Sequence, residues 1–514
     1  MNGLPLDVAL ADERATMRFG QDLALAIARG DCLALYGDLG VGKSTLARAL
    51  IRSVADDQKL DVPSPTFTLV QSYELRIKLA HFDLYRIADP DELIELGLDD
   101  ALEDGAVLIE WPERAASFLP ENAIAIVLEE DGTGRRAHVS GGPEVMDRIN
   151  RTLAARAFID GAGYGDAQRC HFQGDASTRT YETIRLQGRP DHLLMPDRLL
   201  MPDRLLMNAP KRLLGPLMAG GRRYAQIAHI AEDVRPFVAI GDFLKEQGFH
   251  TPEIIARDMD AGFVLLEDLG RKTMLDASGK PIPARWEAAI DCLVALHHTD
   301  IPASIPLPGE ALYDIPAFDR EAMLVEVALI LQWYYPHVHN KGPSAQTEKL
   351  FHACWNEIID RLEAAEKSLV LRDFHSPNIL WQCDCAGIER IGLIDFQDAM
   401  IGPAAYDVAS LVQDARVTVV PQLHDQLVAR YENARAAEPG FDPLAFRQAL
   451  AMMEAQRATK ILGIFVRLDK RDGKPAYMKH LPRIEAYLHR AFDHPVLYPL
   501  RDCYDKIGFA LSES

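Results

Sequence analysis

A glycine-rich stretch near the start of the chain restricts the fold more than any other feature of the sequence. It reads Gly37-Asp38-Leu39-Gly40-Val41-Gly42-Lys43-Ser44, followed by Thr45, and fits the pattern G-x-x-x-x-G-K-[ST]. An apolar segment, 32–36, precedes it, and a segment with helical periodicity, 45–54, follows it. Glycines in this strand–loop–helix order let consecutive backbone N–H groups surround an anion in front of the helix N-terminus. The pattern therefore predicts a phosphate site in an α/β domain.

The neighbouring segments extend this layout. Two helices and two buried strands are expected, at 12–29, 144–158, 107–109 and 123–128. The stretch 131–143 is rich in turn residues and is expected to interrupt the pattern. Residues 160–166 contain three glycines and are expected to lie in a linker. We therefore expect a doubly wound α/β P-loop NTPase domain at 1–150 and a linker at 151–168.

The residue types of the loop indicate its chemistry. In such a loop the Lys43 ammonium reaches the terminal phosphates of ATP, and the Ser44 hydroxyl is a ligand for Mg²⁺. The remaining loop residues, 37–42, and Thr45 contact the phosphates through their backbone. The alternative is a chance match in a turn, but that alternative does not account for the strand and the helix on either side.

Three further motifs narrow the interpretation. They are Ser64-Pro65-Thr66-Phe67-Thr68-Leu69-Val70, His81-Phe82-Asp83-Leu84-Tyr85-Arg86 and Ile109-Glu110-Trp111-Pro112-Glu113. Together with the loop, and in this order, they closely resemble the TsaE family of bacterial ATPases in tRNA threonylcarbamoyladenosine biosynthesis. The resemblance covers roughly residues 5–150.

This resemblance implies roles for three more residues. Thr66 matches a switch residue near the γ-phosphate, Asp83 a Walker-B-like acid, and Glu110 a carboxylate near Mg²⁺. A helix cap for Asp83 and a buried ion pair for Glu110 are the alternatives. The family also implies a partner, the TsaB–TsaD pair, whose turnover is sustained by ATP hydrolysis.

Composition limits the partners and the location. The chain has 514 residues, too many for one hydrophobic core, and a net charge of −21. The first 150 residues carry 14 basic and 27 acidic side chains, a net −13, so tight direct binding of nucleic acid is not expected. No long apolar run or basic leader is present, which favours a cytoplasmic protein without membrane contact. Cys383 and Cys385 are interpreted as two free thiols near a hairpin turn.

A second pattern begins near residue 170. Short β-like segments, ending at 264–267, precede long helical segments such as 284–298 and 317–335. A small β-rich lobe before a large helical lobe is the order of an α+β, protein-kinase-like bilobal domain. We expect this domain at 169–514, with the small lobe at about 169–270 and the large lobe at about 271–514. The repeated Leu-Leu-Met at 193–195, 199–201 and 205–207 is interpreted as a local duplication that lengthens one loop.

Two motifs at a fixed spacing carry the chemistry of the second domain. The first, Leu371-Arg372-Asp373-Phe374-His375-Ser376-Pro377-Asn378, is a kinase-type catalytic loop, and Ile394-Asp395-Phe396-Gln397-Asp398 follows it. Asp373 is the expected base for the attacking hydroxyl, while Asn378 and Asp395 are expected to hold Mg²⁺ over the phosphates of ATP. Ordinary turn chemistry is the alternative.

Two weaker signals complete the expected ATP site. Gly174-Asp175-Ala176-Ser177 fits a loop of small residues over the phosphates, although many hairpin turns look the same. Glu267, Asp268 and Leu269 resemble a hinge that carries adenine through backbone groups, with a charged turn as the alternative.

The second half resembles the aminoglycoside phosphotransferase-like superfamily. Within it, the N-acetylmuramate/N-acetylglucosamine anomeric kinases of cell-wall recycling fit best, over about 165–500. Besides the motifs above, Leu206-Met207-Asn208-Ala209-Pro210, Tyr406-Asp407 and 456–467 carry the resemblance. It implies an amino sugar as the substrate. A kinase for an aminoglycoside, choline or another alcohol, and a non-catalytic module that regulates the ATPase, are the alternatives.

Two positions depart from the usual kinase pattern. Leu371 stands where the loop histidine is common, and Met207 lies near the usual ATP-clamping lysine, for which Arg179 or Lys211 are candidate substitutes. An acidic lactyl sugar needs cationic groups, and Arg457 and Lys460 are candidates.

Overall fold

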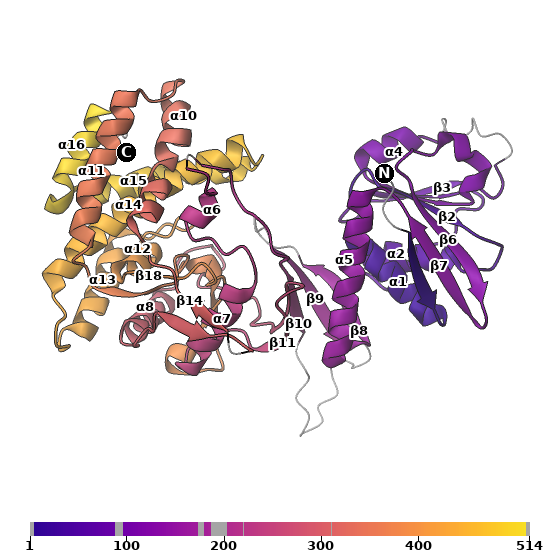
Figure 1. The fold of residues 1–514 in the computed structure, drawn as a ribbon, viewed down its shortest axis with the longest axis horizontal. Helices are drawn as coiled ribbons and strands as arrows, with labels where there is room; N and C mark the ends of the chain where they lie inside the picture. The colour runs from indigo at the N-terminus through magenta and orange to yellow at the C-terminus, as the bar shows by residue number, and fades with distance from the viewer. Residues whose placement is uncertain are drawn as a thin grey trace. The chain divides into compact units, whose positions relative to one another are not determined.

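The computed structural model describes residues 5–87, 96–172, 179–186, 203–218, 220–309 and 311–509 of the chain. The chain divides into two compact units (Figure 1). The first comprises Met1–Asn208 with Phe263–Leu266, and the second comprises Ala209–Gly262 with Glu267–Ser514.

A seven-stranded mixed sheet forms the centre of the first unit. Its strand order is β1-β7-β6-β2-β5-β4-β3, with β5 and β6 parallel to β2 and β4 parallel to β5. The strands are β1 Leu6–Leu10, β2 Cys32–Tyr36, β3 Val70–Tyr73, β4 Leu79–Asp83, β5 Ala106–Glu110, β6 Ile124–Asp131 and β7 Gly134–Ser140. The helices of this part are α1 Glu13–Ala26, α2 Lys43–Val54, α4 Leu98–Asp104 and α5 Pro143–Ile159.

Apolar side chains on both faces of the sheet explain its layers. Leu33 and Leu35 of β2 pack in one core with residues of α1, α2 and α5. Cys32 belongs to a second core with Phe82 of β4 and Leu98 of α4. Alternate residues of one strand therefore face two different cores, as expected for a central parallel strand. The expected doubly wound α/β arrangement is confirmed.

The expectation of turns across 131–143 is wrong, because β7 occupies Gly134–Ser140. Its side chains alternate, with Ala137 and Val139 buried and Arg136 and His138 only partly buried. Gly132, at φ 63°, turns the chain between β6 and β7. The polar and glycine residues that indicated turns therefore form the outer face of an antiparallel strand and its hairpin turn.

The first unit also contains strands of a second sheet. They are β8 Ala167–Phe172, β9 Thr180–Leu186, β10 Arg204–Asn208 and β12 Phe263–Glu267, in the order β12-β10-β9-β8. The third Leu-Leu-Met repeat lies in β10, and the first two repeats lie outside the described residues. Between α5 and β8 the residues Asp160–Tyr164 form one helical turn, in which Gly163 has φ 88°.

The second unit is mainly helical. Its helices are α6 Tyr224–Ile227, α7 Arg235–Glu246, α8 Pro283–His297, α9 Arg320–Val327, α10 Tyr335–His339, α11 Ala345–Leu362, α12 Ala405–Val412, α13 Pro421–Arg435, α14 Pro443–Lys470, α15 Leu481–Phe492 and α16 Tyr498–Lys506. Its strands are β11 Ile254–Asp258, β13 Ser304–Pro306, β14 Leu312–Asp314, β15 Lys367–Val370, β16 Ile379–Trp381, β17 Ile391–Leu393 and β18 Met400–Pro403. The long helix α14 is buried along most of its length and contacts α9, α12 and α15.

Local capping explains where the expected helices begin. The helix expected over 284–298 is α8, with Pro283 in its first turn. The helix expected from 317 begins at Arg320, because the Asp319 side chain accepts a hydrogen bond from the backbone N–H of Ala322. Cys383 and Cys385 are free thiols between β16 and β17, as expected.

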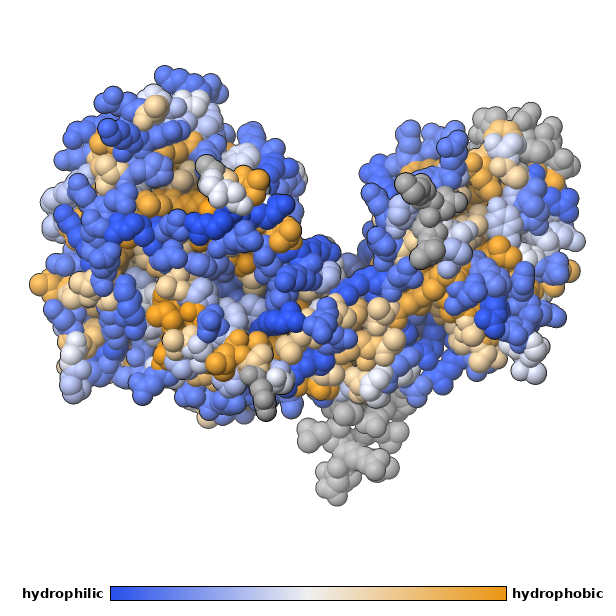
Figure 2. All heavy atoms as spheres, viewed as in Figure 1, coloured by the Kyte–Doolittle hydropathy of each residue, from blue (hydrophilic) through white to orange (hydrophobic). Residues whose placement is uncertain are grey.

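Hydrophilic residues cover most of the visible surface of both units (Figure 2). Among the helices that the structure describes, none combines the length and the apolar character that a membrane crossing requires.

Candidate active sites

The glycine-rich loop lies between β2 and α2, as the sequence predicts. Gly37 has φ 131°, and a Cβ atom there would lie 2.4 Å from the carbonyl oxygen of Leu128. Gly42 has φ 113° and is the N-cap of α2. Both positions therefore require glycine. Arg135 of β7 donates a hydrogen bond to the Val41 carbonyl at 2.9 Å, so β7 supports the loop.

Lys43 and Ser44 start α2 and face the acids of the sheet. The Lys43 Nζ donates to the carbonyl oxygens of Gly37 at 2.6 Å and Asp38 at 3.0 Å. It lies 3.6 Å from the ring centroid of Trp111, which forms a wall of the site. Burial lowers the pKa of Lys43, and the nearby carboxylates, Glu110 first, oppose that shift. Two backbone carbonyl oxygens therefore hold the Lys43 ammonium at the edge of the candidate phosphate site.

The two acids lie side by side at the ends of parallel strands. Asp83 of β4 and Glu110 of β5 are partners in the register of the sheet. Glu110 Oε2 accepts a hydrogen bond from Ser44 Oγ at 2.8 Å. Asp83 Oδ2 accepts from Thr66 Oγ1 at 2.9 Å and from Ser64 Oγ at 2.8 Å. The structure thus brings the switch motif, both acids and the end of the glycine loop together.

His81 is a site residue to which the sequence analysis gave no role. It is 1% exposed, and its Nε2 lies 3.0 Å from Glu110 Oε1. His81 and Asp83 are two apart on β4 and so share a face of the strand. The two-residue spacing between His81 and Asp83 is therefore the sequence signal that places His81 at the site. Because His81 contacts Glu110 Oε1, the other carboxylate oxygen, Oε2, is directed at Ser44.

These groups suit Mg²⁺ and a polyphosphate. Carboxylate and hydroxyl oxygens are the ligands that Mg²⁺ takes, and a buried ammonium next to backbone N–H groups suits phosphate oxygens. When bound, Mg²⁺ supplies charge neutralisation for phosphoryl transfer.

The catalytic loop of the second unit follows β15. Asn378 Nδ2 donates to the carbonyl oxygen of Asp373 at 3.0 Å and to Asp395 Oδ2 at 3.3 Å. Asp395 has φ 60°, and Gln397 Nε2 donates to its Oδ1 at 2.8 Å. The structure therefore brings Asp373, Asn378 and Asp395 together, in an arrangement that suits a base beside two Mg²⁺ ligands.

Buried acids fix the backbone of this loop. Asp407 of α12 accepts hydrogen bonds from the backbone N–H groups of Leu371 at 2.5 Å and Arg372 at 3.0 Å. Asp414 accepts one from Ser376 N at 2.8 Å. Burial raises the pKa of Asp407 to about 7, although these N–H donors favour its charged form. Leu371 thus contributes through its backbone, where many kinases have a histidine.

A buried charge network lies behind the loop. The Arg372 guanidinium is ion-paired with Glu326 of α9, which is fully buried. Lys460 of α14 donates to Tyr406 Oη at 2.7 Å and lies 3.4 Å from Glu326. Arg457 of α14 donates to the Arg372 carbonyl at 2.9 Å. The two proposed cations for the lactyl group, Arg457 and Lys460, are therefore used to support the catalytic loop.

The same network acts on Asp373. Burial alone would raise the pKa of this carboxyl, but His375 and the cations Lys460 and Arg372 outweigh it and hold the pKa below its ordinary value. Asp373 is therefore ionised at neutral pH, as an acceptor for a hydroxyl proton must be.

The remaining expected ATP contacts are only partly described. The hinge candidates lie at the end of β12, where Glu267 N donates to Glu253 O at 2.9 Å and Leu269 O accepts from Gln382 Nε2 at 3.0 Å. Gly174, Asp175, Ala176 and Ser177 lie outside the described residues. Met207 is fully buried in β10, and Tyr181 Oη lies 3.5 Å from its Sδ. Lys211 is exposed.

Comparisons with known proteins match two separate parts of the chain. Residues 10–138 match the family model of the threonylcarbamoyl adenosine biosynthesis protein TsaE, and residues 217–446 match that of the phosphotransferase enzyme family. An N-acetylmuramate/N-acetylglucosamine kinase of Caulobacter vibrioides is 32% identical over 360 residues, which are 69% of this chain and 96% of that protein. The kinase of the same name from Pseudomonas aeruginosa is 35% identical over 270 residues, 51% of this chain and 74% of its own. TsaE of Haemophilus influenzae is 39% identical over 127 residues, 23% of this chain and 79% of its own.

Proposed function

The chain belongs to the TsaE family through its N-terminal part and to the N-acetylmuramate/N-acetylglucosamine kinase family through its C-terminal part, and we propose that both activities reside in this one polypeptide. It is an enzyme that uses ATP with Mg²⁺ in two reactions. One is ATP hydrolysis in support of threonylcarbamoyladenosine formation in tRNA, and the other is phosphorylation of an amino sugar.

For the ATPase, the supporting observation is the hydrogen bond between Ser44 and Glu110 at the end of the glycine loop. Ser44, Asp83 and Glu110 would hold Mg²⁺, Lys43 would neutralise the terminal phosphates, and Thr66 would respond to the γ-phosphate through Asp83. We infer a TsaB–TsaD-type complex as the partner, because an acidic domain with a net −13 is poorly suited to hold tRNA itself.

For the kinase, the supporting observation is that Asn378 bonds to both the Asp373 backbone and Asp395. Asp373 would accept the proton of the anomeric hydroxyl of N-acetylmuramate or N-acetylglucosamine. Asn378 and Asp395 would hold Mg²⁺ over the ATP phosphates. Gly174–Ser177 would cover those phosphates, and the backbone of Glu267, Asp268 and Leu269 would contact adenine.

A substrate panel tests the kinase assignment. The full chain, Mg²⁺ and ATP are incubated with N-acetylmuramate, N-acetylglucosamine, choline or an aminoglycoside, and the products are identified by phosphorus NMR. We expect an acid-labile sugar 1-phosphate from at least one of the two sugars. A 6-phosphate, or phosphorylation of choline or the aminoglycoside alone, would favour a kinase for another alcohol.

The isolated chain is expected not to bind tRNA tightly at physiological salt. Phosphate contacts require clustered Lys and Arg side chains, whereas the first 150 residues carry 14 basic and 27 acidic ones. A gel-shift titration with tRNA, without partner proteins, measures this. A submicromolar dissociation constant would contradict the prediction. The control is the same titration repeated with TsaB and TsaD present.

A further inference from the structure

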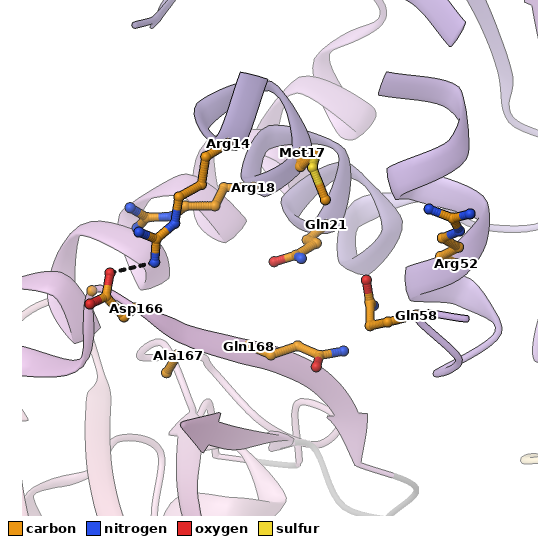
Figure 3. Close-up of a pocket in the computed structure, with 10 residues that line it drawn as sticks. Arg14, Met17, Arg18, Gln21, Arg52, Gln58, Asp166, Ala167 and Gln168 are labelled. Carbon is orange, nitrogen blue, oxygen red and sulfur yellow. Dashed lines mark hydrogen bonds and ion pairs between the residues drawn. The ribbon is translucent and has the colours of Figure 1, made fainter. Parts of the chain in front are cut away.

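A cavity of about 480 Å³ lies within the first unit, apart from the glycine-rich loop. It is lined by α1, by the end of α2 with the residues after it, and by the start of β8. Arg52 stands nine residues after Lys43 on α2, about 14 Å along the helix axis, so the cavity is separate from the expected ATP site. Its volume suits a small organic molecule. Its polar lining includes Arg14, Arg18, Gln21, Arg52, Gln58 and Asp166 (Figure 3).

Three guanidinium groups of this lining have unused donors. In the described structure Arg14 bonds to Asp166 at 2.6 Å through Nη2 alone. Arg18 bonds to Asp160 at 2.7 Å, also through Nη2 alone. Arg52 donates only its Nε, to a backbone carbonyl oxygen after α2 at 2.9 Å, and it forms no ion pair with a described residue. A guanidinium has five N–H donors in a planar fork that fits phosphate or carboxylate oxygens, so the lining suits an anionic group.

The charge of the cavity differs from that of the surrounding domain. The first 150 residues carry a net −13, yet three lining side chains are cationic and one, Asp166, is acidic. The Arg14 and Asp166 side chains are 64% and 78% exposed, and exposed ion pairs contribute little to stability. An anion of a ligand can therefore replace Asp166 at Arg14 at little cost. Arg52 can receive an anion without giving up an acid partner.

The amide of Gln21 lies in the wall without a hydrogen-bond partner. Gln21 is 6% exposed, and its side chain bonds to no described residue. In Figure 3 the amide points into the space between α1 and β8. Gln58, after α2, has a buried Nε2 that also lacks an acceptor in the described structure. Buried amides without partners cost free energy, so both glutamines indicate a ligand that brings hydroxyl or amide groups.

We propose that this cavity binds an N-acylated sugar phosphate, the class of product that the proposed kinase releases. The Arg52 guanidinium takes the phosphate, and hydroxyl and acetamido groups of the sugar meet Gln21 and Asp166. The described lining contains no aromatic ring on which a nucleobase could stack. A sugar without a phosphate leaves Arg52 unused. The choice of this sugar phosphate rests on the proposed kinase function, whereas the cavity itself does not.

Calorimetric titration of the full chain with N-acetylglucosamine 1-phosphate, without ATP and Mg²⁺, tests the proposal. Arg52→Gln removes the cation and is expected to raise the Kd about tenfold or more. Gln21→Met removes the amide at similar size and should raise the Kd about threefold to tenfold. Arg48→Gln, on the same helix but outside the lining, is the matched control and should leave the Kd unchanged. Equal Kd values for all three variants would overturn the proposal.

Excess N-acetylglucosamine, present throughout the titration, separates the cavity from the kinase site. Without ATP this sugar fills the substrate site of the proposed kinase, but it lacks the phosphate that Arg52 requires. One equivalent of the 1-phosphate should therefore still bind. Loss of all binding in the presence of the sugar would overturn the proposal. Inorganic phosphate should bind about tenfold more weakly than the 1-phosphate, and equal affinity would show an anion site without a sugar ligand and so refute the assignment.

The fold of each variant is checked by its thermal unfolding temperature. If Arg52→Gln proves unstable, Gln21→Met still decides the outcome, because methionine fills the space of the glutamine. Failure of the proposed kinase function is seen separately, as the absence of sugar phosphate in the substrate panel. The titration still measures the cavity in that case, because the 1-phosphate is supplied rather than formed.

Discussion

Replacing Asp373 with Asn is expected to lower kcat for sugar phosphorylation by about two or more powers of ten, the usual scale for the loss of a general base. The amide keeps the size of the side chain but cannot accept the hydroxyl proton. The charge removed is one that His375, Lys460 and Arg372 stabilise in the native site. The affinity for ATP should change little, because Asp373 is not proposed to touch the nucleotide. Steady-state kinetics with nucleotide titrations measure both quantities.

Asp395→Asn is the variant to compare with Asp373→Asn, because it separates the loss of a Mg²⁺ ligand from the loss of the base. Asp395 accepts hydrogen bonds from Asn378 and Gln397 and is a proposed Mg²⁺ ligand, so its loss should weaken Mg²⁺-dependent ATP binding as well as turnover. A simple folding defect would harm both variants alike. Full activity of Asp373→Asn would show that another group accepts the proton.

The sequence predicted the parts of both sites that are local in the chain. The glycine loop is one run of eight residues between a strand and a helix, and its conformation depends on glycines at fixed places. The same holds for the catalytic loop, where Asp373 and Asn378 are five residues apart and bond to each other directly. The residue roles proposed from these motifs rest on that geometry.

The supporting contacts could not be predicted in the same way. The His81–Glu110 contact depends on the register of β4 against β5, and the Arg372–Glu326 pair depends on how α9 packs against a loop 46 residues away in sequence. Arg457 and Lys460 were expected to meet the substrate because their charge suits a carboxylate. In the structure Lys460 lies 3.4 Å from Glu326, and Arg457 donates a hydrogen bond to the Arg372 carbonyl behind the catalytic loop.

The composition of β7 is that of a turn rather than a strand. Two glycines, a threonine and two arginines over 132–136 indicate a turn, yet three of these residues begin a strand that contributes Arg135 to the support of the glycine loop. An antiparallel strand with one exposed face tolerates polar residues there, so β7 has apolar side chains only at Ala137 and Val139, whereas β2 is apolar throughout.

Lys43→Ala is expected to abolish the ATPase activity of the N-terminal domain while sugar phosphorylation continues. The Lys43 ammonium lies between Trp111 and the loop carbonyls. Among the described residues, it is the only cationic side chain in the first turn of α2. Its loss should lower ATP hydrolysis by about two or more powers of ten, as expected when a group that stabilises charge in the transition state is removed. Lys78→Ala is the matched control, because Lys78 is an exposed lysine of the same unit that pairs only with surface acids.

Measuring both activities on the one Lys43→Ala protein makes the prediction decisive. Each half of the chain has its own phosphate-binding motif and its own set of proposed Mg²⁺ ligands, so one site can be disabled without the other. Loss of both ATP hydrolysis and sugar phosphorylation in a folded Lys43→Ala protein would instead mean that the two reactions share one nucleotide site.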